Sequence, residues 1–176
     1  MSTASQPTPD DLIAVGRQLG RPPRGVVGVA HRCPCGEPDV VRTASRLPDG
    51  TPFPTTFYAT CPRLTGAVST LEASGMMREM SARLAGDPVV AQGYRRAHSD
   101  YLRRRSELGE VAETAGVSAG GMPARVKCLH ALVAHALAAG AGVNPFGDEA
   151  LAALPQWWRP QGCAERMGQK ATEEAP

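Results

Sequence analysis

Aromatic side chains are scarce in this chain, which has eight among 176 residues, and isoleucine occurs once, at Ile13. The core must therefore be built mainly from Leu, Val, Ala and Met. Long apolar runs are missing as well. The longest, 132–143, is rich in Ala and Gly and carries His135, whereas a membrane span needs about 20 mainly apolar residues. We therefore expect no membrane partner.

Net charge is almost absent, because 19 basic residues stand against 17 acidic ones. This balance excludes a strongly basic nucleic-acid-binding arm or an acidic tail as the main functional element, and it argues against a nucleic-acid partner. The first twelve residues contain no Lys or Arg, so the basic part of a secretory signal is missing. We expect a cytoplasmic protein, whose five reduced cysteines serve metal binding, catalysis or simple burial.

The order of the secondary-structure signals predicts one α+β domain over 9–160, between disordered segments at 1–8 and 161–176. The first helix, at 9–19, has Thr8 as its cap and Gly20 at its end. The predicted strands are 26–31, 39–44 and 55–60. Three short strands in succession indicate a small antiparallel meander.

About five helices are expected to pack on this meander. They include helices at 88–108, 123–139 and 148–154. The helix at 123–139 is apolar around most of its circumference, which is typical of a buried central helix. It also carries Cys128 and His135, which share a face because they are seven residues apart, whereas His130 points away. Each histidine is either a core residue bonded to a carbonyl or an acid/base group, so His130 and His135 are the catalytic candidates.

A glycine-rich segment, SAGGMP, precedes this helix and suggests an anion site. Free N–H groups at a helix start suit phosphate or carboxylate. Gly120 and Gly121 would shape the loop, and Arg125 and Lys127 would supply positive charge, with Arg24 approaching from the sheet. A plain loop leading into a helix explains the same residues equally well.

Four of the five cysteines lie in the motifs HRCPCG, TCP and KCLH. Cys33 and Cys35 fall in the turn after the first strand and Cys61 at the end of the third, and both positions share one edge of a meander. Cys128 would be the fourth ligand, with His31 as a substitute. Zinc favours four tetrahedral N or S ligands, so we predict a zinc site. An iron–sulfur cluster, a catalytic thiol and ordinary buried cysteines are the alternatives.

Several motifs together resemble a known family. They are RPPRG, HRCPCG, RLPDGTPFPT, TCP, LEASG, SAGGMP, RVKCLH and GVNPFGDEAL, and over about 11–160 they are similar to the bacterial domain-of-unknown-function family five hundred and one. Genes of that family often lie near a septum-formation initiator, an enolase and an exopolyphosphatase. The resemblance implies a cytoplasmic bacterial protein with a loose link to cell division or polyphosphate metabolism, and it implies no activity. Cys163 falls outside the motifs, in the predicted tail.

Three functions fit these features, and they leave open whether the chain is an enzyme. The first is a metal-dependent enzyme, or a metal-supported binder, acting on a small phosphorylated or carboxylate ligand. The second is a thiol enzyme with Cys128 as nucleophile and His135 as base. The third is a non-catalytic protein linked to cell division that binds a protein partner. A closed four-sulfur site without a cleft beside it would favour the third.

Overall fold

The computed structural model describes residues 4–159 and Cys163. Its first helix, α1, spans Pro9–Leu19, as predicted. A capping box fixes the start of this helix. The Thr8 hydroxyl accepts the N–H of Asp11 at 3.1 Å, and the Asp11 carboxylate accepts the N–H of Thr8 at 2.9 Å. Gly20 ends α1 in the left-handed conformation, with φ of 66°.

The predicted strands form one antiparallel sheet in the order β1-β2-β3, which confirms the α+β class. The strands are β1 Val26–Arg32, β2 Pro38–Thr43 and β3 Phe57–Ala59. Val41 in the central strand faces Val29 on one side and Tyr58 on the other. Because β1 and β3 both run antiparallel to β2, the end of β1 and the end of β3 lie at the same edge of the sheet.

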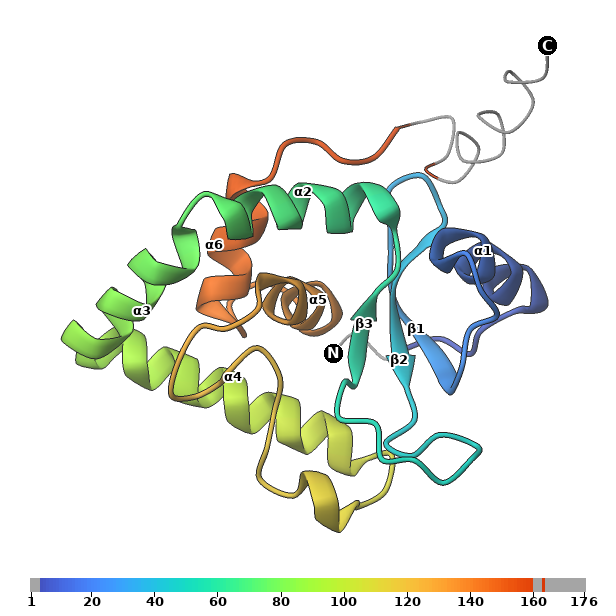
Figure 1. Ribbon diagram of the computed structural model, residues 1–176, viewed down its shortest axis with the longest axis horizontal. Helices are drawn as coiled ribbons and strands as arrows, with labels where there is room; N and C mark the ends of the chain where they lie inside the picture. The colour runs from blue at the N-terminus through green and yellow to red at the C-terminus, as the bar shows by residue number, and fades with distance from the viewer. Residues whose placement is uncertain (1–3, 160–162, 164–176) are drawn as a thin grey trace.

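Helices make up most of the rest of the described chain. They are α2 Pro62–Ala73, α3 Met76–Gly86, α4 Pro88–Ser106, α5 Leu129–Ala139 and α6 Pro145–Ala153, with a short 3-10 helix, η1, at Ala112–Thr114. Figure 1 shows α1 on one side of the sheet and α5 on the other, with α2, α4 and α6 around α5. Asp87 caps α4, since its carboxylate accepts the N–H groups of Val89 and Val90.

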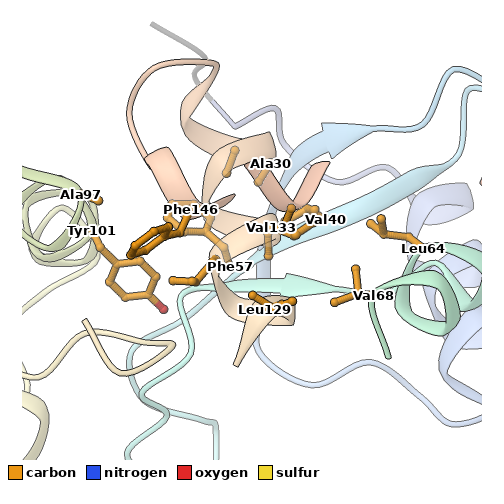
Figure 2. Close-up of a cluster of buried hydrophobic side chains, with 14 of the residues drawn as sticks. Ala30, Val40, Phe57, Leu64, Val68, Ala97, Tyr101, Leu129, Val133 and Phe146 are labelled. Atoms are coloured by element: carbon orange, nitrogen blue, oxygen red, sulfur yellow. The ribbon is translucent and has the colours of Figure 1, made fainter. Parts of the chain in front are cut away.

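Helix α5 forms the centre of the core, as predicted for a buried helix. Leu129 and Val133 are fully buried, and α5 packs against the sheet, α2 and α6. Figure 2 shows Phe57 from β3 beside Tyr101 from α4. The two rings meet edge to face with their centroids 5.6 Å apart. This arrangement stabilises the core beyond what the burial of the two rings contributes.

The predicted start of α5 at Pro123 is wrong, because the helix begins at Leu129. Between these residues Val126 is buried, while Arg125 and Lys127 on either side of it are exposed. This alternation is the pattern of an extended segment. The prediction counted Val126 as part of the apolar stripe of the helix.

Helix α6 begins three residues earlier than predicted, at Pro145 instead of Asp148. Its cap is Asn144, whose side-chain oxygen accepts the N–H of Gly147 at 3.0 Å. Asp148 instead accepts the N–H of Gly142 at 2.8 Å. The Asn-Pro pair is the same kind of start signal as the Asp-Pro pair before α4.

Part of the N-terminal segment that was predicted to be disordered is described, and there Ser5 pairs with Val29 through two backbone bonds of 3.0 and 2.9 Å. The remaining predicted disordered residues, 1–3, 161–162 and 164–176, lie outside the described part of the chain. Among the described residues, no helix is both long and apolar enough to cross a membrane.

Asp11 joins the α1 cap to the sheet, because its carboxylate also accepts two bonds from Arg32 at 2.7 and 2.8 Å. The Arg32 guanidinium holds the pKa of Asp11 well below its usual range. The charged Asp11 carboxylate therefore contributes its full stabilisation above the ordinary carboxyl pKa of about 3.9, and this stabilisation is lost as the pH falls towards the lowered pKa of Asp11.

We expect Asp11→Asn to lower the free energy of unfolding by about 1–2 kcal/mol at neutral pH.

Urea denaturation measures this loss, and the gap between Asp11→Asn and wild type should narrow below about pH 4. Asp10→Asn is the matched control, because Asp10 is an exposed residue of the same helical turn. An equal loss of unfolding free energy in both variants would contradict the stabilising role given to the Asp11–Arg32 contact.

Candidate metal centre

Three thiols, those of Cys33, Cys35 and Cys163, lie together and are called here the thiol cluster. The Sγ of Cys163 lies 3.7 Å from that of Cys33 and 3.6 Å from that of Cys35. The tight turn after β1 presents the first two sulfurs. In this turn the N–H of Cys33 donates to the Glu37 carbonyl at 2.9 Å and the N–H of Gly36 donates to the Cys33 carbonyl at 2.8 Å. All five cysteines of the chain are free thiols.

The sulfur spacings match those of ligands around one tetrahedral ion. Two sulfurs that each lie about 2.3 Å from such an ion are about 3.8 Å apart. Both measured distances from Cys163 are within a few tenths of an ångström of that value. The thiol cluster could therefore hold a metal ion.

Burial makes negative charge costly in the thiol cluster. It raises the pKa of Cys33 far above its usual range and that of Cys163 to about 11. Burial also opposes ionisation of Cys35, but hydrogen bonds outweigh it, first from the Glu37 backbone and then from the neighbouring thiols, and the pKa of Cys35 is lowered. Three thiolates would need a cation between them, because unpaired charges are expensive to bury.

Cys61, a predicted ligand, is fully buried directly before α2 and makes no side-chain bond that caps this helix. Donor atoms within 4.8 Å of one another are found for the three cluster thiols and not for Cys61. The predicted ligand Cys61 therefore lies outside the thiol cluster as the structure describes it.

Cys163 is the cluster residue that sequence reasoning missed. It follows Cys33 by 130 positions and lies in the segment that was predicted to be a disordered tail. One signal could have found it. A four-sulfur site that uses Cys33, Cys35 and Cys61 needs one more thiol, and only Cys128 and Cys163 are left in the chain.

Two predicted ligands, Cys128 and His31, lie elsewhere. The Nδ1 of His31 is 2.7 Å from a carboxylate oxygen of the buried Asp39. Cys128 belongs to a second group, in which its donor atom and those of Glu72 and His130 lie within 4.8 Å of one another. The predicted four-cysteine set is thus divided between two places in the fold.

The glycine loop predicted to bind an anion uses its groups internally. The N–H of Arg125 donates to the Gly121 carbonyl at 3.0 Å, and that of Lys127 donates to the Gly120 carbonyl at 2.8 Å. A Cβ on Gly120 would lie 2.6 Å from a methyl carbon of Leu132. The glycines therefore permit a tight turn that packs closely on α5.

The start of α5 already has a carboxylate of the protein. The N–H of Leu129 donates to the Glu72 carboxylate at 2.7 Å, in the place where an external anion would bind. Arg24, the predicted third cation, forms an exposed ion pair with Asp49. Gly120 lies against the start of α5, but the N–H of Leu129 there already has an anionic partner and Arg24 is paired elsewhere, so the anion site stays a prediction.

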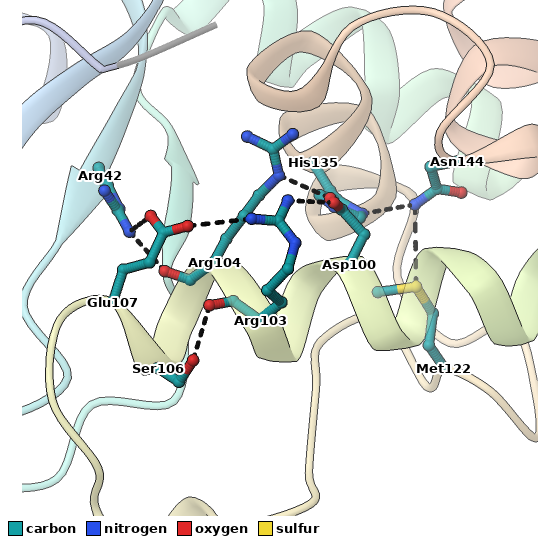
Figure 3. Close-up of polar contacts among 9 residues, drawn as sticks. All are labelled: Arg42, Asp100, Arg103, Arg104, Ser106, Glu107, Met122, His135 and Asn144. Carbon is teal, nitrogen blue, oxygen red and sulfur yellow. Dashed lines mark hydrogen bonds and ion pairs between the residues drawn. The ribbon is translucent and has the colours of Figure 1, made fainter. Parts of the chain in front are cut away.

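His135 is fully buried, and both of its ring nitrogens have partners (Figure 3). The Gly147 N–H donates to the Asn144 side-chain oxygen at 3.0 Å, which fixes the orientation of this amide. The amide nitrogen of Asn144 then donates to Nδ1 of His135 at 3.2 Å. Nε2 must carry the ring proton and donates it to Asp100 at 3.0 Å.

Asp100 connects this histidine to the surface of α4. Burial raises the pKa of Asp100, but hydrogen bonds from His135, Arg103 and Arg104 outweigh it and hold the pKa well below its usual range. The carboxylate is therefore charged and fully engaged. His135 is a satisfied core residue, which was one of the two interpretations that the sequence allowed.

His130, the other catalytic candidate, is half-buried near the start of α5. Its Nδ1 lies 3.1 Å from Glu72 and its Nε2 lies 3.1 Å from the Thr65 carbonyl. A hydrogen bond with Cys128, opposed by burial and reinforced by Glu72, raises the pKa of His130 to about 9. At neutral pH the ring is protonated and is not a free base. The histidine paired with Cys128 is therefore His130 and not His135.

A family model described as "Protein of unknown function (DUF501)" matches residues 29–152, which is more than half of the chain. The chain belongs to this family. The predicted resemblance is confirmed, over a shorter region than expected. No curated protein and no solved structure matches the chain. Cys33, Cys35, Cys61 and Cys128 lie within the DUF501 match, and Cys163 lies beyond its end.

A stability measurement tests the structural role of His135 in this DUF501 protein. Asn144→Ala removes the cap of α6 and leaves Nδ1 of His135 buried without a donor. We expect a loss of about 2–3 kcal/mol in the free energy of unfolding. Gln156→Ala, a change at an exposed residue, should stay within about 0.5 kcal/mol of wild type. Equal urea midpoints for the two variants would show that the hydrogen bonds of Asn144 contribute little to the free energy of unfolding.

Proposed function

We propose that this DUF501 protein binds a zinc ion through the thiol cluster, with Cys61 as the fourth sulfur, and that the ion has a structural role. The observation that carries the proposal is the spacing of 3.7 and 3.6 Å between the sulfur of Cys163 and those of Cys33 and Cys35. A four-cysteine zinc site is closed, whereas a catalytic one keeps a position for water or substrate.

Burial of the sulfurs supports a structural rather than a catalytic ion. Cys33 and Cys163 are each 3% exposed and Cys61 is 0% exposed. Among the four sulfurs, only that of Cys35 belongs to a residue that is partly exposed. An ion held by all four would therefore have little access to a substrate.

Such an ion would join three distant parts of the chain. Cys33 and Cys35 lie in the turn after β1, Cys61 lies at the start of α2, and Cys163 follows the last helix by ten residues. Holding Cys163 at this end of the sheet is a scaffolding task, and it favours a non-catalytic interaction protein over an enzyme. The link to cell division that the resemblance implies makes a division protein the first partner to test.

Metal analysis of the purified full-length protein, kept reduced, tests the ion directly. We expect zinc, and we expect Cys33→Ser and Cys163→Ser each to contain one equivalent less than wild type. Gln156→Ala is the control, because Gln156 is exposed and belongs to neither group of metal-binding side chains, so this change should leave the zinc content as in wild type. Unchanged zinc content in both cluster variants would contradict the proposal, and a coloured, iron-containing protein would replace zinc with an iron–sulfur cluster.

Thermal unfolding with a chelator gives an independent measure. An ion present at 1,000 times its dissociation constant adds about 4 kcal/mol to the stability. Each kcal/mol shifts Tm by about 2–4 °C in a chain of this size, so we expect a loss of roughly 10 °C. Cys33→Ser should melt at a lower temperature and respond less to the chelator. A chelator that leaves the wild-type Tm unchanged would argue against a structural ion.

A further inference from the structure

A second group of metal-binding side chains lies away from the thiol cluster, where α2 meets the start of α5. Its members are Glu72, Cys128 and His130, each half-buried, with donor atoms within 4.8 Å of one another. Cys128 directly precedes α5, His130 is the second residue of that helix, and Glu72 lies in the last turn of α2. The group brings together sulfur, nitrogen and oxygen donors, which is a combination that zinc accepts.

Backbone contacts hold two of the three donors in place. The Glu72 carboxylate accepts the N–H of Leu129 at 2.7 Å, and the same oxygen lies 3.1 Å from Nδ1 of His130. Two ligands of one tetrahedral ion, each at about 2.0–2.1 Å, are about 3.3 Å apart. The spacing of Glu72 and His130 is therefore already close to that of a shared ion.

The far side of the imidazole has the partner that a metal-binding histidine needs. Nε2 of His130 lies 3.1 Å from the Thr65 carbonyl, and a carbonyl oxygen only accepts, so Nε2 carries a proton. The Ser69 hydroxyl lies 3.3 Å from the same nitrogen. Histidines that bind metals donate their second N–H to a carbonyl or carboxylate, which fixes the ring. This contact turns Nδ1 towards Glu72 and Cys128.

We infer that Glu72, Cys128 and His130 form a second site, for a divalent transition metal such as zinc, with three protein ligands and an open fourth position. Binding of the ion would release the proton that His130 carries on Nδ1. A thiolate and a carboxylate would balance the two charges of the ion, and the N-terminal end of α5 favours both anions. All three side chains are partly exposed, so the fourth position faces solvent. This open geometry is that of catalytic zinc sites, in contrast to the closed geometry proposed for the thiol cluster.

Cobalt titration of the metal-free full-length protein distinguishes the two sites. Wild type should bind one equivalent more than Cys128→Ser, His130→Asn or Glu72→Gln, whereas Cys33→Ser should keep the ion at this second site. Lys127→Ala is the matched control, because Lys127 is the exposed neighbour of Cys128, and it should bind as wild type does. Wild-type binding in all three site variants would overturn the inference without touching the proposal for the thiol cluster.

A second measurement decides the question with the wild-type protein, so its main outcome does not depend on how a variant folds. Zinc should slow the alkylation of Cys128 in the wild-type protein by at least about tenfold, because a metal-bound thiolate is a poor nucleophile. Peptide mass spectrometry follows Cys128 separately from the other cysteines. His130→Asn should remove this protection, provided that its circular dichroism is native. An equal rate of Cys128 alkylation with and without zinc in the wild-type protein would overturn the inference of a metal site.

Discussion

The burial of α5 is the constraint on which the rest of the fold depends. Seven of its eleven residues are buried, because the sheet covers one side while α2 and α6 cover others (Figure 1). A helix in this position has almost no face left for polar groups, so His135 must find its partners inside the protein. Asp100 and Asn144 provide them from α4 and from the cap of α6. The histidine thereby joins three helices.

Close packing around α5 also decides where glycine is required. A Cβ on Gly147 would lie 2.3 Å from the Leu132 carbonyl and 2.8 Å from the Ala136 side chain. Both distances are too short for a real Cβ, so the absence of a side chain at Gly147 allows α6 to approach the α5 backbone as closely as it does. Gly120 packs on Leu132 in a similar way from the preceding loop. The glycine loop that suggested an anion site therefore has a structural explanation in the same helix.

The sequence predicts this fold well where the signals are local and poorly where partners are distant. Thr8, Asp11 and Gly20 determine α1 within a few residues, so its bounds are correct. The meander places Cys33 and Cys61 at one sheet edge, because the directions of successive strands alternate. Cys163 and the pairing of His135 with Asp100 depend instead on contacts between segments 130 and 35 positions apart, which no local pattern contains.

Helix α2 explains why the cysteines do not form a single site. Cys61 directly precedes it and Glu72 lies in its last turn. Eleven residues at 1.5 Å each separate their backbones by about 16 Å along the axis, whereas ligands of one ion lie within about 4 Å of each other. Cys128 sits with Glu72 and so cannot share an ion with the turn after β1. The length of α2 therefore separates the end of the sheet, where the thiol cluster lies, from the group formed by Glu72, Cys128 and His130.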